Sequence, residues 1–177
     1  ALTVTALVDL VTRMGHRHGD DPRMQPLMDE AAARSEVLGD PFVSASVVLQ
    51  RGWAKGALRG DFEGSIQDCR EAVRLAKEVH DANAVAENMY ILGCSLRFAG
   101  RLSEARPLLE EAGTEMARLG LHPNRPLFVL CWAAECYLVE ADRVGFLRLL
   151  CSLEGLGLTQ RSWAHVHPIR GFACVLG

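Results

Sequence analysis

Residues 86–119, AENMYILGCSLRFAGRLSEARPLLEEAGTEMARL, contain two helical patterns joined by a break at Gly100. After the break, apolar residues recur at steps of three and four from Ala105 to Leu119, which places them on one face of a helix. Before it, residues 84–98 are rich in Ala, Leu, Gly and Cys and carry little charge, so a helix there must be covered on more than one side. The stretch therefore predicts two packed, antiparallel helices.

The same break recurs along the chain at a nearly constant interval. Four residues mark it, spaced by 41, 40 and 41 positions: Gly19, Gly60, Gly100 and Ala141. A second series of breaks alternates with the first, at 38–40, 79–81 and 119–121. Two interleaved breaks in each period indicate two helices per repeat, for example 45–58 followed by 61–81. The chain is then a single array with the approximate units 5–40, 46–81, 86–121 and 127–157 and a partial unit 163–177.

Particular residues are placed to begin and end these helices. Asp61 and Ser103 are expected to cap the second helices of two units, because their side chains can accept a hydrogen bond from the first turn. Gly39 and Gly120 are expected to supply the left-handed residue that ends a helix. Small residues within the helices, such as Gly56 and Gly93, are expected where a neighbouring helix approaches closely. These local signals support an all-α fold.

Unit 86–119 resembles the tetratricopeptide-repeat (TPR) family. The residues that fall at the family's spacing are Leu92, Gly93, Leu96, Gly100, Ala105, Leu109 and Ala112. The neighbouring units match less completely, with Gly52-Trp53 in place of Leu-Gly and Ala141 in place of the turn glycine. The period near 40 exceeds the ~34 of the standard repeat, and it is similar to that of degenerate helical arrays in bacterial LuxR- or MalT-type regulators. The resemblance implies a right-handed α-solenoid of antiparallel helix pairs.

Composition restricts the setting of the protein. The chain has 19 basic and 22 acidic residues and a net charge of −3, so no general field attracts it to nucleic acid or an anionic membrane. Nearly all the basic residues are Arg, a skew that a GC-rich coding sequence produces, which points to a bacterial source. No apolar run approaches the ~20 residues of a membrane span, and the beginning of the chain has no features of a signal peptide. The chain also begins without Met and stops within an apolar stretch, so we expect a segment of a longer polypeptide.

The six cysteines lie among apolar residues and include no Cys-x-x-Cys pair, which favours buried, reduced thiols in a cytoplasmic protein. The His-x-His pairs at 16–18 and 165–167 cannot chelate one ion from a helix, because side chains two residues apart diverge. No nucleophile, zinc or phosphate-loop signature is visible. We therefore expect no catalysis, no metal and no cofactor.

An array of helix pairs presents a curved groove that is lined by the first helix of each repeat. By the resemblance, the candidate groove residues are Arg13, Gln50, Glu87, Tyr90, Arg97, Phe98, Phe128 and Glu135, with Asp9, His16, Cys94, Cys131 and His167 beside them. Aromatic and Arg side chains dominate binding hot spots, so Tyr90, Arg97, Phe98 and Phe128 are the strongest candidates. The alternative is that Phe98 and Phe128 only seal adjacent repeats. We expect the Trp residues to pack within or between repeats.

These observations favour a non-catalytic protein-interaction or ligand-sensing module of a bacterial signalling or transcriptional regulator. The expected occupant of the groove is a peptide, a protein domain or a small inducer. A structural or self-association spacer is the alternative, and it would form homo-oligomers. A small helical enzyme is a less favoured alternative.

Overall fold

The computed structural model describes residues 2–120 and 125–155 of the chain, and no strand occurs in these ranges. The helices are α1 (Val4–His18), α2 (Met24–Leu38), α3 (Pro41–Trp53), η1 (Ala54–Leu58), α4 (Phe62–Glu78), α5 (Ala82–Phe98), α6 (Leu102–Arg118), α7 (Arg125–Val139) and α8 (Arg143–Gly155). The predicted all-α class is confirmed. The partial unit 163–177 lies outside the described residues.

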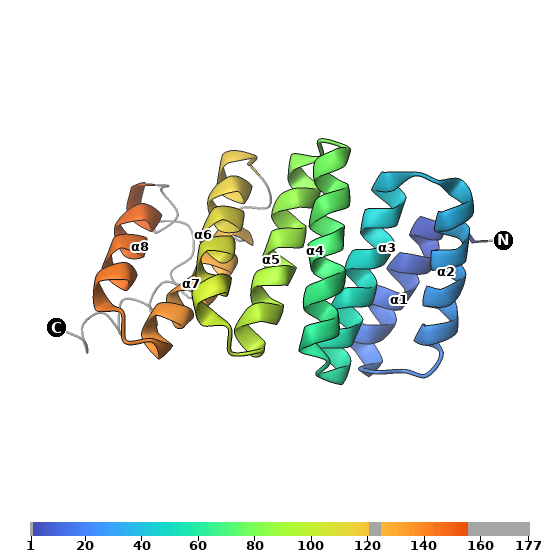
Figure 1. The fold of residues 1–177 in the computed structure, drawn as a ribbon, viewed down its shortest axis with the longest axis horizontal. Helices are drawn as coiled ribbons and strands as arrows, with labels where there is room; N and C mark the ends of the chain where they lie inside the picture. Colours follow the sequence, from blue (N-terminus) through green and yellow to red (C-terminus); the bar gives the residue numbers. More distant parts are fainter. Residues whose placement is uncertain (1, 121–124, 156–177) are drawn as a thin grey trace.

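The helices follow one another along the long axis of the molecule, and consecutive helices run in opposite directions (Figure 1). Each helix packs on the next in sequence, and α1, α3, α5 and α7 also contact one another in that order. These four helices therefore form one layer, and the even-numbered helices flank it. The unit boundaries and the right-handed superhelix remain predictions.

The apolar core is divided along this row of helices. One cluster of buried residues joins α1, α2 and α3, where Leu7, Met24 and Val47 meet. A second cluster runs from Ile66 on α4 to Leu153 on α8. Because every part of the core is made by neighbouring helices, each element is stabilised mainly by the elements beside it in sequence.

The predicted breaks are turns with left-handed backbone. Gly39 ends α2 at φ 64° and ψ 17°, and Gly120 follows α6 at φ 65°, so both predictions are confirmed. Ala141 occupies the equivalent position between α7 and α8 at φ 54°, although it carries a Cβ atom. An L-residue other than Gly is disfavoured in this conformation by about 1–2 kcal/mol. The fourth break therefore has a positive φ like the other three, at a higher cost for a residue with a Cβ atom.

One of the two predicted caps is correct. The Asp61 side chain accepts a hydrogen bond from the backbone N–H of Gly64 at 2.9 Å, which confirms it as the cap of α4. The prediction for Ser103 is wrong, because α6 already begins at Leu102 and Ser103 lies inside its first turn. The reason is the register of the turn: the N–H of Arg101 bonds to the carbonyl of Leu96 at 2.9 Å, as that of Asp81 bonds to Ala76 before α5, so the cap position falls on Arg101. That bond brings the chain into the next helix before Ser103 is reached.

The first helix of the second unit differs from its prediction. It begins at Pro41 after the cap Asp40, four residues earlier than expected, and its last turns widen into the π-helix η1. Gly56 of η1 lies directly against α4, where an added Cβ would be 2.8 Å from the Oγ atom of Ser65. Gly93 is similarly close to Leu109, at 2.7 Å. The expectation that these glycines permit close packing is confirmed.

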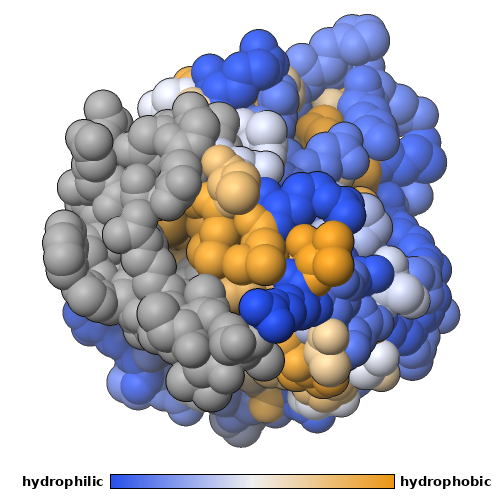
Figure 2. Space-filling view, turned by 90° about the vertical axis from the view of Figure 1, so that its left-hand side faces the viewer, coloured by the Kyte–Doolittle hydropathy of each residue, from blue (hydrophilic) through white to orange (hydrophobic). Residues whose placement is uncertain are grey.

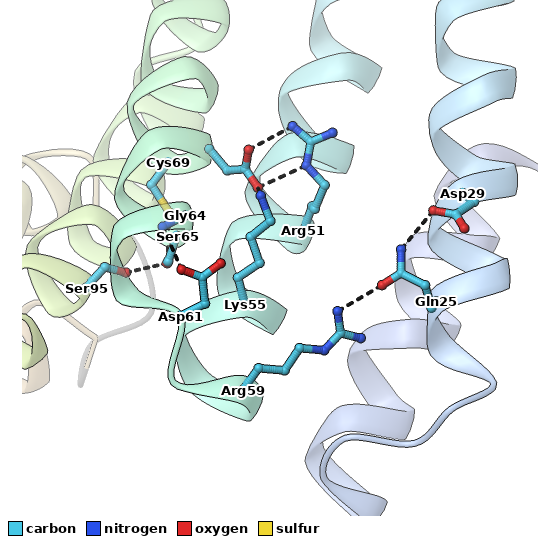
Figure 3. Close-up of polar contacts among 11 residues, drawn as sticks. Gln25, Asp29, Arg51, Lys55, Arg59, Asp61, Gly64, Ser65, Cys69 and Ser95 are labelled. Carbon is cyan, nitrogen blue, oxygen red and sulfur yellow. Dashed lines mark hydrogen bonds and ion pairs between the residues drawn. The ribbon is translucent and has the colours of Figure 1, made fainter.

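Polar contacts reinforce the same junctions (Figure 3). Arg51 of α3 donates two hydrogen bonds to the carboxylate of Asp68 on α4, at 2.8 and 2.9 Å, and Lys55 approaches the same carboxylate at 2.8 Å. The hydroxyl groups of Ser65 and Ser95 lie 2.7 Å apart and connect α4 to α5. The groups that could have carried chemistry here are therefore engaged in joining helices.

Candidate functional site

The layer formed by α1, α3, α5 and α7, called the inner layer below, carries a continuous set of aromatic and arginine side chains on α5 and α7. We define the aromatic–arginine surface as Tyr90, Arg97, Phe98, Arg125, Phe128 and Trp132. Its rings meet edge to face, with centroid separations of 5.9 Å for Phe98–Trp132, 5.7 Å for Phe128–Trp132 and 6.1 Å for Tyr90–Phe128. The Phe98–Trp132 and Tyr90–Phe128 contacts join α5 to α7, whereas the Phe128–Trp132 contact lies within α7.

Each arginine of this surface lies between an aromatic ring and a carboxylate. The guanidinium carbon of Arg97 is 4.3 Å from the ring centroid of Trp132, and Arg97 also pairs with Glu135. The guanidinium carbon of Arg125 is 4.8 Å from the ring centroid of Tyr90, and its Nη2 atom is 2.5 Å from Glu87. Burial opposes the charge of Arg125, but the bond to Glu87 outweighs it and raises the pKa of the guanidinium. Both arginines are therefore held as rigid cations.

The rings differ in how much surface they offer to a partner. Phe98 is 53% exposed and Phe128 is 37% exposed, although each contacts a ring of a neighbouring helix. The two residues thus seal adjacent helices and also present apolar surface. Tyr90 is only 9% exposed, so it lies beneath the more exposed rings and offers a partner little surface of its own. Burial raises the pKa of its hydroxyl.

Two hollows lie beside the aromatic–arginine surface, and both belong mainly to the inner layer. We call the larger one, of about 270 Å³, the polar hollow; Thr12, His16, Gln50, Glu87 and Arg125 line it together with apolar side chains. The smaller one, of about 140 Å³, is the apolar hollow; Phe62, Cys94, Phe98 and Trp132 are among its walls. Trp53, Tyr90 and Ile91 line both hollows, so the two are neighbours.

The structure brings most of the predicted groove residues together. Glu87, Tyr90, Arg97, Phe98, Phe128 and Glu135 all lie in or beside the aromatic–arginine surface, and Gln50 lies in the polar hollow. Arg13 is exposed on α1 and lines neither hollow. His167 lies outside the described residues.

Sequence reasoning missed two contributors to this site, Arg125 and Trp132. Both lie on α7 within one turn of Phe128, so helical spacing from that candidate could have found them. The Trp residues are expected to pack within or between repeats, and the ring of Trp132 contacts that of Phe98 on α5.

Burial disfavours the thiolate form of the cysteines near the site. Burial raises the pKa of Cys94 to about 12 and that of Cys131 and Cys136 to about 11, so these thiols are protonated at neutral pH. The expectation that all six cysteines are buried is wrong for Cys151, which α8 exposes. Among the described residues, Phe146, Leu149 and Leu153 share the buried face of α8, and Cys151 lies off that face. Cys174 lies outside the described residues.

The remaining candidate sites lie outside the aromatic–arginine surface. A third hollow, of about 580 Å³, lies between α4, α5 and α6 and is lined by His80, Lys77 and several glutamates. Within residues 2–120 and 125–155, no group of three or more His, Cys, Asp or Glu side chains is placed to hold a metal ion. None of the described helices is long and apolar enough to cross a membrane. Neither a protein-family model nor a curated protein sequence matches this chain.

Proposed function

We propose that this chain is a non-catalytic, TPR-like right-handed α-solenoid that binds a peptide or a partner domain on its aromatic–arginine surface. The exposure of Phe98 and Phe128, beside two arginines held in place by carboxylates, carries the proposal. Aromatic rings and arginines dominate the binding energy of protein interfaces, and rigid side chains lose little entropy on binding. A small inducer that occupies the hollows would use the same walls.

The spacing of the ion pairs supports the repeat assignment. Arg97 and Glu135 are 38 residues apart, and so are Glu87 and Arg125. Arg59 and Asp20, which join η1 to the turn before α2, are separated by 39 residues. Contacts at nearly one period are what a stack of similar units produces, because equivalent positions on successive units face each other. The resemblance to helical arrays of LuxR- or MalT-type proteins supports a place in a bacterial, cytoplasmic signalling or transcriptional regulator.

A selection from a displayed library of random peptides tests the binding function. We expect the wild-type protein to enrich one motif, and we expect Phe98→Ala and Phe128→Ala each to weaken binding of the enriched peptide by at least tenfold, as for a residue in an interface hot spot. Phe42→Ala is the matched control, because Phe42 is also about half exposed but lies at the beginning of α3. If no motif is enriched, or if the control loses as much affinity, the proposed surface is wrong.

Self-association is the second candidate, and the face of α8 favours it. Figure 2 shows apolar atoms gathered on the end of the molecule that carries α8, with hydrophilic residues to their right. Val144 and Leu147 of α8 are among the exposed apolar residues. Sedimentation over a range of protein concentrations tests this candidate. An oligomer that forms as the concentration rises, and that Leu147→Asp converts to a monomer, would support a self-association module. A wild-type protein that is monomeric at all concentrations would exclude it.

A further inference from the structure

The largest of the three hollows, of about 580 Å³, lies on the side of α5 that faces away from the polar hollow. Val85 and Met89 line it, whereas Glu87 and Ile91, each two residues further along, line the polar hollow. Side chains two positions apart on a helix point about 200° apart, so the two hollows open on opposite sides of α5. We call the hollow that Val85 and Met89 line the outer groove.

One face of α5 and one face of α6 form most of the outer groove. From α5 it takes apolar residues at positions 82, 85, 86 and 89, and from α6 it takes polar residues at positions 110, 111, 114 and 115. Each set has the spacing of one helix face. α5 lies between α4 and α6 and packs on both (Figure 1). The positions on α5 extend for about 10 Å, which is the length of about three extended residues of a bound peptide.

The wall on α6 presents two carboxylates that have no ion-pair partner in the part of the chain that the structure describes. Glu115, the third carboxylate of this wall, pairs with Arg118 at 2.5 Å. Glu110 accepts a hydrogen bond from the hydroxyl of Tyr137, and neither Glu110 nor Glu111 forms an ion pair with a described residue. This wall therefore attracts a cationic group.

The described cations near the wall on α6 leave this attraction in place. Arg106, one turn before Glu110, pairs with Glu140 and Asp142 at 3.1 and 3.0 Å. Lys77 belongs to the opposite wall, at the end of α4, and forms no ion pair with a described residue. The outer groove thus keeps the charges of its two walls apart across an apolar floor.

These features favour one class of occupant. Within 2–120 and 125–155, the carboxylates of the groove are not placed to hold a metal ion. A phosphate group, and with it a nucleic acid or an anionic lipid, would be repelled by the carboxylates of α6. A peptide segment with an apolar side chain and a basic one matches both the floor and the anionic wall, and its backbone carbonyl groups can accept hydrogen bonds from Lys77.

We propose that the outer groove is a second binding surface, which takes a short basic segment of a partner protein with an apolar side chain on Val85 and an arginine or lysine against Glu111. The inference does not depend on the proposed function, which uses the aromatic–arginine surface. One chain can then hold two partners at once, because the two surfaces do not overlap. Exposed ion pairs are individually weak, so we expect modest affinity that falls as salt is added.

The first test uses the peptide acetyl-Arg-Leu-Arg-amide and follows the methyl resonances of Val85 by carbon–proton NMR. Their absence from the spectrum of Val85→Ile assigns them. We expect a saturable shift, and binding at least about fivefold weaker when citrulline, which has the shape of arginine without its charge, replaces both arginines. Replacing the leucine by glycine should weaken binding about tenfold, because the floor then buries no apolar side chain. Absence of a saturable Val85 shift, or equal binding of either analogue, overturns the inference.

The second test changes the wall on α6. Glu111→Lys is expected to weaken binding of acetyl-Arg-Leu-Arg-amide at least about fivefold, and Glu111→Gln, which removes the charge without reversing it, should lie between wild type and Glu111→Lys. Glu36→Lys on α2 is the matched control, because Glu36 is also exposed and the change in charge is the same. Equal losses for Glu111→Lys and Glu36→Lys would mean that the peptide responds only to net charge, and the inference would fail.

Further measurements separate this inference from the alternatives. If the Val85 resonances shift with protein concentration alone, a second copy of the chain covers the outer groove and the inference is wrong. Phe98→Ala is expected to leave binding of acetyl-Arg-Leu-Arg-amide unchanged, and an equal loss in that variant would place the peptide on the aromatic–arginine surface. If the peptide library enriches nothing while the Val85 shift is observed, the proposed function fails and the outer groove stands.

Discussion

Neutralising Asp68 is expected to loosen the junction between α3 and α4. The side chain of Asp68 is 9% exposed and faces Arg51 and Lys55, whose side chains are 44% and 31% exposed. Removal of one partner from a fully buried pair costs about 3–5 kcal/mol, because the remaining charge is stranded. Here the two cations can turn toward water, so we expect Asp68→Asn to lower the free energy of unfolding by about 2 kcal/mol. For a chain of this size the melting temperature should fall by about 4–8 °C.

A second carboxylate on α4 provides the control. Glu71 pairs with Arg74 on the surface, and both side chains are about half exposed. Glu71→Gln is therefore expected to cost no more than about 0.5 kcal/mol. Thermal and urea unfolding, followed by circular dichroism, measure both variants. Equal losses for the two variants, or a loss below about 0.5 kcal/mol for Asp68→Asn, would refute the reasoning from burial.

The effect of Asp68→Asn should also depend on pH. Burial alone would raise the pKa of Asp68, but the bonds from Arg51 and Lys55 outweigh it and hold the pKa below the ordinary value of 3.8. A carboxyl group whose pKa is lowered on folding stabilises the protein above its unfolded pKa, and this contribution is lost as the pH falls through the folded pKa. The difference between wild type and variant should therefore be constant from pH 7 to about pH 5 and shrink below about pH 4. A difference that grows in acid would contradict the assignment.

Three further predictions concern single positions. Ala141→Gly should raise the free energy of unfolding by about 1 kcal/mol, because glycine tolerates the left-handed backbone at φ 54° better than alanine does. The control Ala33→Gly, in the exposed middle of α2, should lower that free energy by a similar amount. Urea unfolding measures both variants, and a loss of stability for Ala141→Gly would contradict the geometry. Gly113→Ala should destabilise the protein by about 1 kcal/mol or more although alanine favours helix, since its Cβ would lie 2.5 Å from Cγ of the buried Leu130, and a stabilised variant would show that α7 can move aside. The buried Cys69, whose pKa is raised to about 11, should react with iodoacetamide only as the protein unfolds, whereas the exposed Cys151 should react in the native state. Peptide mass spectrometry measures the two reactions separately, and equal rates would be inconsistent with the burial of Cys69.

The elements of the fold could be predicted because their signals are local. The spacing of apolar residues in 105–119 and the break at Gly100 describe a helix and its limits without reference to other parts of the chain. Ser103 shows where this reasoning ends, because the turn places the cap position at Arg101, whose side chain makes no capping hydrogen bond. The π-helix η1 is a second example, since the preceding residues read as an ordinary helix and the close approach of α4 to Gly56 is a tertiary contact.

The candidate site could be predicted only in part. Helical spacing and the family resemblance selected Glu87, Arg97 and Glu135, but sequence alone could not show that Arg97 pairs with Glu135 or that Arg125 pairs with Glu87. These partners are 38 residues apart, so their contact depends on how one helix pair is stacked on the next.

The sequence by itself determined that this protein is helical and where the chain breaks between its helices fall, because helix formation and chain breaks depend on neighbours within a few positions. Only the tertiary structure decided that Tyr90 is covered, that Phe98 and Phe128 remain exposed, and that two hollows share the walls Trp53 and Tyr90. Exposure is a property of the packed helices, since it depends on which side chains from helices distant in sequence meet in space.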